Sequence, residues 1–122
     1  MRPFHRQKLP DHSALLSGRK PPDDTGFKSE QLQIWYNNTD VSWVGGGEAP
    51  HMHTISDECF IVLVGTLVVE VEGERFTLGP REFCCFPAGV YHAILEVRPP
   101  VETLMIRAPS IEDNVYQARV RS

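Results

Sequence analysis

The chain has 122 residues, which fits one domain with a buried core of its own. Its apolar fraction of 41% and charged fraction of 23% are those of an ordinary globular protein. With a net charge of −4 and no block of basic residues, we expect no nucleic-acid partner. No window has the length of a membrane-spanning helix or of a signal peptide's apolar core, so we expect no membrane partner either.

The cysteine pattern predicts free thiols. Cys59, Cys84 and Cys85 are three in number, an odd count, and two of them are adjacent. This arrangement does not suit an ordinary disulfide framework. Thiols stay reduced in the cytoplasm, so we expect a cytoplasmic protein.

Residues 1–30 are polar and interrupted by prolines, with a turn signal over residues 20–26. They predict a mostly irregular N-terminal arm with at most one short helical turn near residues 12–16. The arm either lies over a neighbouring subunit or is a disordered tail, and the composition favours neither alternative.

Residues 31–109 predict a single all-β domain. Eight short segments rich in β-branched and aromatic residues follow one another, and most are closed by Gly, Pro or Asn. No apolar period of 3.6 residues persists, so the pattern indicates a sandwich or barrel of short strands. Residues 110–122 are left as a C-terminal tail.

The best-defined element is a hairpin over residues 67–78. Leu67, Val69 and Val71 alternate with a second set that is mostly acidic, so the odd-numbered side chains are expected to point inward. A tight turn follows, in which Gly73 takes the strained backbone position.

Two segments carry histidines that suit metal binding. His51 and His53 are one residue apart, so on a strand both imidazoles lie on the same face and reach one ion. Glu58 follows after four residues that can turn the chain back beside them. Taken alone, this pattern also fits two solvated histidines on an exposed strand. The second segment, residues 80–96, places His92 after a Pro-Ala-Gly turn and at the head of an apolar strand.

The first segment resembles the first motif of the cupin superfamily. Gly45 is followed after five residues by His51 and His53, after four more by Glu58, and after six more by Gly65. The spacing matches that motif at every position.

The second segment resembles the second cupin motif in part. Pro87, Gly89 and His92 match it, whereas Arg81 and Glu96 stand where the motif has its opening glycine and its closing asparagine. These departures bear on the shape of a turn and on the pocket rim, and not on the ligands.

The resemblance implies a small antiparallel β-barrel of the jelly-roll type with a metal at its mouth. Its protein ligands would be His51, His53, Glu58 and His92. Three imidazoles and one carboxylate suit one divalent transition metal (Fe, Mn, Ni, Co, Cu or Zn) rather than Ca or Mg. Four protein ligands on an octahedral ion leave two positions for water, substrate or O2, as in catalytic sites.

Five further residues are candidates for the pocket or for supporting the ligands. Alternation along the strands places Phe83 and Ile94 inward. Glu96 either orients an imidazole or is a surface glutamate at a strand end. Arg107 either pairs with an anionic substrate or is a solvated charge, and Trp43 either contacts a ligand or packs between subunits.

The resemblance leaves three functions open. The first is a metal-dependent, dioxygenase-like oxidoreductase of small organic molecules, similar to the quercetinase-like small cupins. The second is a non-redox isomerase, epimerase or lyase acting on a sugar or keto acid, and the third is a module that only binds a small molecule. Small cupins are commonly dimeric, and with the exposed apolar residues of the early strands this predicts a homodimer.

Overall fold

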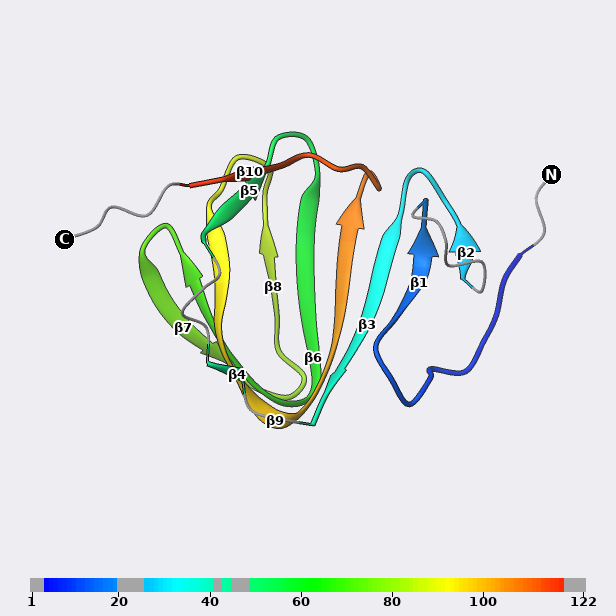
Figure 1. The fold of residues 1–122 in the computed structure, drawn as a ribbon, viewed down its shortest axis with the longest axis horizontal. Helices are drawn as coiled ribbons and strands as arrows, with labels where there is room; N and C mark the ends of the chain where they lie inside the picture. The colour runs from blue at the N-terminus through cyan, green and yellow to red at the C-terminus, as the bar shows by residue number, and fades with distance from the viewer. Residues whose placement is uncertain (1–3, 20–25, 41–42, 45–48, 118–122) are drawn as a thin grey trace.

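The computed structural model describes residues 4–19, 26–40, 43–44 and 49–117, and within these residues no helix is long and apolar enough to cross a membrane. Ten strands are found there, all in one sheet (Figure 1). They are β1 (Ala14–Gly18), β2 (Phe27–Lys28), β3 (Gln33–Thr39), β4 (Trp43–Val44), β5 (His51–His53), β6 (Asp57–Val71), β7 (Glu74–Leu78), β8 (Phe83–Phe86), β9 (His92–Ala108) and β10 (Asn114–Tyr116).

Two long, bent strands form the frame of the fold. β6 and β9 pair antiparallel from Asp57 opposite Ala108 to Val71 opposite His92. Each of these long strands covers a part of the sequence that predicts two short strands. β6, for example, passes through Gly65 without ending. Gly65 has a φ of +86°, and a Cβ there would lie 2.2 Å from the Pro100 carbonyl oxygen. Only glycine therefore allows this bend against β9.

The other strands extend this frame on both sides (Figure 1). The path through the sheet is β10-β5-β9-β3-β1-β2, with β4 added to β9 and with β7 and β8 added to β6. All pairs are antiparallel except β1 with β2. The expectation of an antiparallel, all-β fold is confirmed, although the sheet does not close into a continuous barrel.

The core lies on the inner face of the two long strands. The hairpin of β6 and β7 contributes Leu67 and Val69, as its alternation predicts, and Gly73 takes a positive φ in the turn. The buried cluster consists of Phe60, Val62, Leu67, Val69, Leu78, Phe86, Val101 and Met105. Four of these residues, Phe60, Leu67, Val101 and Met105, line a cavity together with His51 and His92.

The N-terminal arm joins the sheet of its own chain, and residues 12–16, where at most one helical turn was expected, form none. Residues 14–18 form β1 instead, antiparallel to β3, with Leu15 and Ser17 buried in alternation. A short apolar run cannot distinguish a strand from a helical turn by periodicity alone. The partner strand, which lies about twenty residues further on, decides the outcome.

The expectation of three free thiols is wrong for two of them. Cys59 and Cys85 face each other on β6 and β8 and form a disulfide. Cys84 is the free cysteine, and burial raises its pKa to about 11. Adjacent cysteines on a strand point to opposite faces, so only one of the two reaches Cys59.

Candidate metal centre

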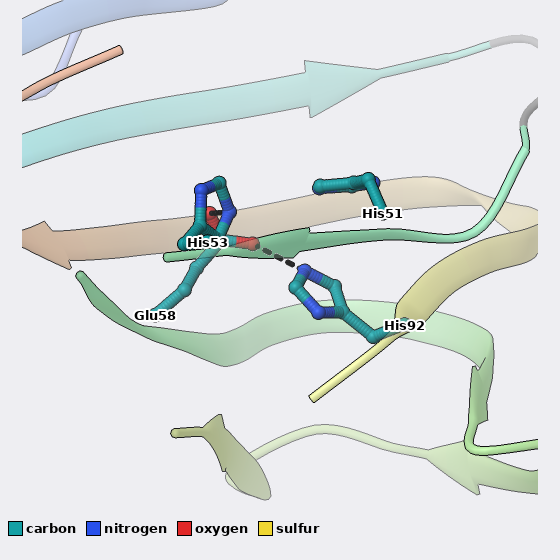
Figure 2. A group of neighbouring side chains, drawn as sticks. All are labelled: His51, His53, Glu58 and His92. Atoms are coloured by element: carbon teal, nitrogen blue, oxygen red, sulfur yellow. Dashed lines mark hydrogen bonds and ion pairs between the residues drawn. The ribbon is translucent and has the colours of Figure 1, made fainter. Parts of the chain in front are cut away.

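Three strands, β5, β6 and β9, bring the four candidate ligands together. β5 lies between β10 and β9, and its register sets His51 directly opposite His92. Glu58, at the start of β6, points toward His53 and His92 (Figure 2). One ligand atom from each of the four side chains lies within 4.8 Å of all the others.

The turn before His92 is fastened to the His51–His53 segment. The Gly89 amide donates to the His53 carbonyl oxygen at 2.8 Å. The Ala88 amide donates to Asp57 Oδ1 at 3.0 Å. These two bonds, one to a backbone oxygen and one to a side-chain oxygen, tie the second histidine segment to the first.

The His92 ring is held by two contacts. It stacks on Phe86 with ring centroids 4.1 Å apart and planes 9° from parallel. Its Nδ1 lies 3.1 Å from the Val90 carbonyl oxygen, which only accepts hydrogen bonds, so Nδ1 carries the proton. In a neutral imidazole this leaves Nε2 as a lone pair, and it faces Glu58 Oε1 at 3.1 Å.

His53 is held in the same way. Its Nδ1 lies 3.1 Å from Asp113 Oδ1, so this nitrogen donates and Nε2 is left as the lone pair. Nε2 lies 2.9 Å from Glu58 Oε2 but has no partner in hydrogen-bonding geometry. When both imidazoles are neutral, they direct lone pairs at the two oxygens of one buried carboxylate.

This arrangement requires a positive charge between its members. Lone pairs that face a carboxylate repel it unless protons or a cation lie between them. First-row metals bind such ligands at about 2.1 Å, and neighbouring ligands of an octahedron are then about 3 Å apart. The observed separations of 2.9 and 3.1 Å match that edge, so the cluster could bind a transition-metal ion.

The surroundings of the site keep two of the candidate ligands, His51 and Glu58, in the forms that bind metals. Burial raises the pKa of Glu58. In the metal-free protein, the hydrogen bond that His92 donates when its Nε2 carries a proton, together with the charges of His53 and Arg107, outweighs burial, so the pKa of Glu58 lies below its usual value. Burial and the neighbouring His92 lower the pKa of His51 from 6.5 to about 4. At neutral pH, His51 is thus a neutral imidazole and Glu58 a carboxylate.

A cavity of about 520 Å³ adjoins the cluster. Its walls are mainly apolar, and its polar side chains apart from the ligands are Asn37, Thr39, Thr103 and Arg107. The apolar lining comes from Trp35, Phe60, Leu67, Ile94, Val97, Val101 and Met105. A pocket of this size and polarity is typical of small-molecule sites.

Two of the five predicted pocket residues line this cavity, namely Ile94 and Arg107. The alternative in which Arg107 is a solvated charge is wrong, because its side chain is 11% exposed. It lies opposite Glu58 on the neighbouring strand, with Nε 3.2 Å from Glu58 Oε2. The guanidinium therefore neutralises part of the carboxylate charge and faces the ligand space.

The placement of Phe83 in the pocket is wrong. Its side chain is 68% exposed and lies on the outer face opposite Ile61, whereas Phe86 and Cys84 face inward. The segment Phe-Cys-Cys-Phe places one phenylalanine and one cysteine on each face in either phase. Alternation alone therefore could not choose between the two phases.

Glu96 does not support a histidine. It accepts a hydrogen bond from Arg98 Nε at 2.8 Å and is not part of the cavity wall. A bulge moves it out of phase, since Val68 pairs with Glu96 whereas Val69 pairs with Ile94. Val97 takes the inward position instead. Trp43 lies opposite Val97 on β4, and its side chain is outside the described part of the structure.

Two supporting residues were not predicted from the sequence. Phe86 was not a candidate, and placing Phe83 inward would put Phe86 on the outer face. Asp113 lies in the segment taken as a C-terminal tail, which instead forms β10 beside β5. Its carboxylate accepts hydrogen bonds from His53 and from the amides of Ile55 and Ser56. Burial raises the pKa of Asp113, but these three donors outweigh it and the pKa is lowered.

The first cupin motif is covered only in part, because Gly45 lies outside the described residues. A family model described as "Cupin domain" matches residues 41–106. A search of curated proteins finds no match.

Solved structures share the fold of this chain. KdgF from Halomonas sp. is 22% identical over 83% of this chain and 80% of its own, with a TM-score of 0.63. The DMSP lyase DddQ from Ruegeria pomeroyi DSS-3 is 22% identical over 85% of this chain and 50% of its own, with a TM-score of 0.61. A Streptomyces PAC13 variant with uridine is 11% identical over 97% and 95%, with a TM-score of 0.63. Identities this low establish a common fold and no more.

Proposed function

Because the chain belongs to the cupin domain family, we propose that it is a metal-dependent enzyme acting on a small organic molecule, with dioxygenase-like oxidation as the favoured reaction. One observation carries this proposal. His53 and His92 each commit Nδ1 to an acceptor of the chain and direct Nε2 at the same carboxylate, Glu58. These groups are arranged as ligands for a cation.

The residues of the site have two roles: some would hold the ion, and others shape the cavity. His51, His53, Glu58 and His92 would hold the ion, which when bound supplies two open coordination positions and, if redox-active, the means to activate the substrate or O2. Arg107 faces the cavity and suits an acidic group on the substrate. The apolar wall, with Ile94 near the ligands, keeps water away from the bound molecule.

The cavity composition favours oxidation over proton transfer. Among the described residues that line it, the titratable side chains are His51, Glu58, His92 and Arg107. Three of these are the candidate ligands and the fourth is a guanidinium, which does not give up its proton. An isomerase or epimerase needs a positioned acid and base, and no further side chain of the lining offers one.

A non-redox lyase or isomerase of a keto acid is the second candidate. Arg107 favours it, because a buried guanidinium beside the ligand set suits a substrate carboxylate. One solved structure of the same fold is the DMSP lyase DddQ. The base in such a reaction would have to come from the ligand set itself.

Oxygen consumption separates these candidates. Protein loaded with Fe(II), and separately with redox-inert Zn(II), is mixed with small chelating hydroxy-ketones and keto acids in an oxygen electrode. We expect O2 uptake with Fe(II), none with Zn(II), and none with a Glu58→Gln variant. Turnover with Zn(II) under anaerobic conditions would favour the second candidate. Binding without turnover under either metal would leave only a binding module.

A further inference from the structure

The C-terminal strand β10 reaches the metal centre from outside the matched family segment, residues 41–106. It pairs with β5, setting Asn114 opposite His53 and Tyr116 opposite His51. The Tyr116 and His51 rings lie 5.6 Å apart, and Arg107 donates to Asn114 Oδ1 at 3.4 Å. β10 thus borders both histidines of the first motif.

Asp113, just before β10, makes the closest of these contacts. Its side chain is 5% exposed and is surrounded by three donors. Oδ2 accepts from the amides of Ile55 at 2.9 Å and Ser56 at 2.8 Å, and Oδ1 accepts from His53 Nδ1 at 3.1 Å. The backbone amides cannot reverse their role, but an imidazole can exchange its proton between its two nitrogens.

We infer that Asp113 is a positioning residue of the metal centre, which fixes the His53 tautomer so that Nε2 is free to bind the ion. A carboxylate only accepts hydrogen bonds, so it holds the His53 proton on Nδ1. The opposite tautomer would place a proton on Nε2, between His53 and Glu58, where the ion belongs. Partners of this kind on metal-binding histidines typically change metal affinity 10- to 100-fold, roughly.

An aspartate that only stabilised the loop would make the same contacts to Ile55 and Ser56. The test must therefore separate this structural role from the positioning of His53. Asp113→Asn does this. Its amide oxygen can satisfy the two fixed backbone donors, which leaves its NH2 group facing His53. The imidazole must then accept at Nδ1 and carry its proton on Nε2. The hydrogen bonds to the Ile55 and Ser56 amides are kept, while the His53 proton moves from Nδ1 to Nε2.

The first readout is metal affinity, with Co(II) as the probe and a chelator as the competitor. We expect Asp113→Asn to bind Co(II) about 10- to 100-fold more weakly than the wild type and to shift its visible absorption bands. Metal-free Asp113→Asn should unfold at nearly the wild-type denaturant concentration. The control, Glu112→Gln, removes the same charge from the neighbouring exposed position and should change Co(II) affinity by less than about threefold.

The second readout needs no variant. Zn(II) is diamagnetic, so long-range 1H–15N spectra of the Zn(II)-loaded wild type can report which His53 nitrogen carries the proton. A proton on Nδ1 supports the inference, and ligation through Nδ1 overturns it. So does equal Co(II) affinity in wild type and Asp113→Asn. The inference rests on the proposed metal centre; if the wild type binds neither ion, the centre itself fails. If the wild type binds both and Asp113→Asn is unaffected, only the role of Asp113 fails.

Discussion

At the scale of single residues, the grouping of the candidate ligands His51, His53 and Glu58 was predictable because its determinants are local. The spacing of His51, His53 and Glu58 depends on strand alternation and one short turn, which the sequence contains. The partner that orients the His53 ring is not local. Asp113 lies 60 residues from His53, and nothing in its own neighbourhood indicates that β10 pairs with β5. Long-range pairing of this kind has no signature in a single sequence.

His51 should make the metal-free protein sensitive to mild acid. Its pKa falls from 6.5 to about 4 in the folded state. As the pH drops below 6.5, the unfolded chain takes up a proton that the folded chain refuses, so stability is lost between about pH 6.5 and 4. Above that window His51 contributes no pH dependence.

Denaturant unfolding of metal-free protein across this window measures the effect. We expect the wild-type midpoint to fall between about pH 7 and pH 4.5, and to fall less in His51→Asn. Equal slopes in both proteins would show that His51 is not held neutral by its surroundings.

At the scale of elements, the strands were found but their phase and continuity were not. Val68 pairs with Glu96, whereas Val69 pairs with Ile94, so β9 has a bulge between these two pairs. Because of the extra residue, Val97 points inward in place of Glu96. Because the Phe-Cys-Cys-Phe segment is symmetric, the sequence does not indicate which residues of β8 face inward. Both errors concern alternation, which a single extra residue reverses.

Gly65 in β6 and Gly73 in the β6–β7 turn allow the cost of a steric clash to be measured separately from the cost of backbone strain. Both Gly65 and Gly73 have positive φ, +86° and +84°. A Cβ at Gly65 would lie 2.2 Å from the Pro100 oxygen, whereas at Gly73 it would meet nothing within 4 Å. Gly73→Ala should therefore cost about 1–2 kcal/mol, the strain alone.

Gly65→Ala should cost clearly more, about 3 kcal/mol or above, because the two long strands must separate at the bend. Chemical denaturation of the two variants beside the wild type measures the difference. Equal losses in the two variants would show that β6 and β9 do not approach closely at Gly65.

At the scale of the whole molecule, the disulfide weakens the reasoning for a cytoplasmic location. That prediction assumed three free thiols, and Cys59 and Cys85 are paired. Disulfides persist mainly in oxidising compartments. The cytoplasmic location stays a prediction, now without support from the cysteines.

Thiol counting tests the pairing. Protein purified without reductant and denatured should react at one cysteine per chain, Cys84, and at three after reduction. A Cys84→Ser variant should react at none before reduction. Three reactive thiols in the unreduced wild type would contradict the disulfide.

The outer face of the sheet is where we propose that two copies of the chain meet. Ile61 of β6 lies opposite both Phe83 of β8 and Leu104 of β9, and Phe83 is 68% exposed. Apolar residues that neighbour one another on an exposed sheet face are typical of a subunit interface. Light scattering should give the mass of a dimer for the wild type and of a monomer for Phe83→Asp. A monomeric wild type would contradict the proposal.

The central claim is that His51, His53, Glu58 and His92 hold a metal ion, and elemental analysis tests it most directly. The protein is purified without added metal or chelator, beside a variant with both His51→Ala and His53→Ala. We expect the wild type to carry a near-stoichiometric transition metal and the variant to have lost most of it, because two of four ligands are gone. Equal metal content in the two proteins would contradict the claim.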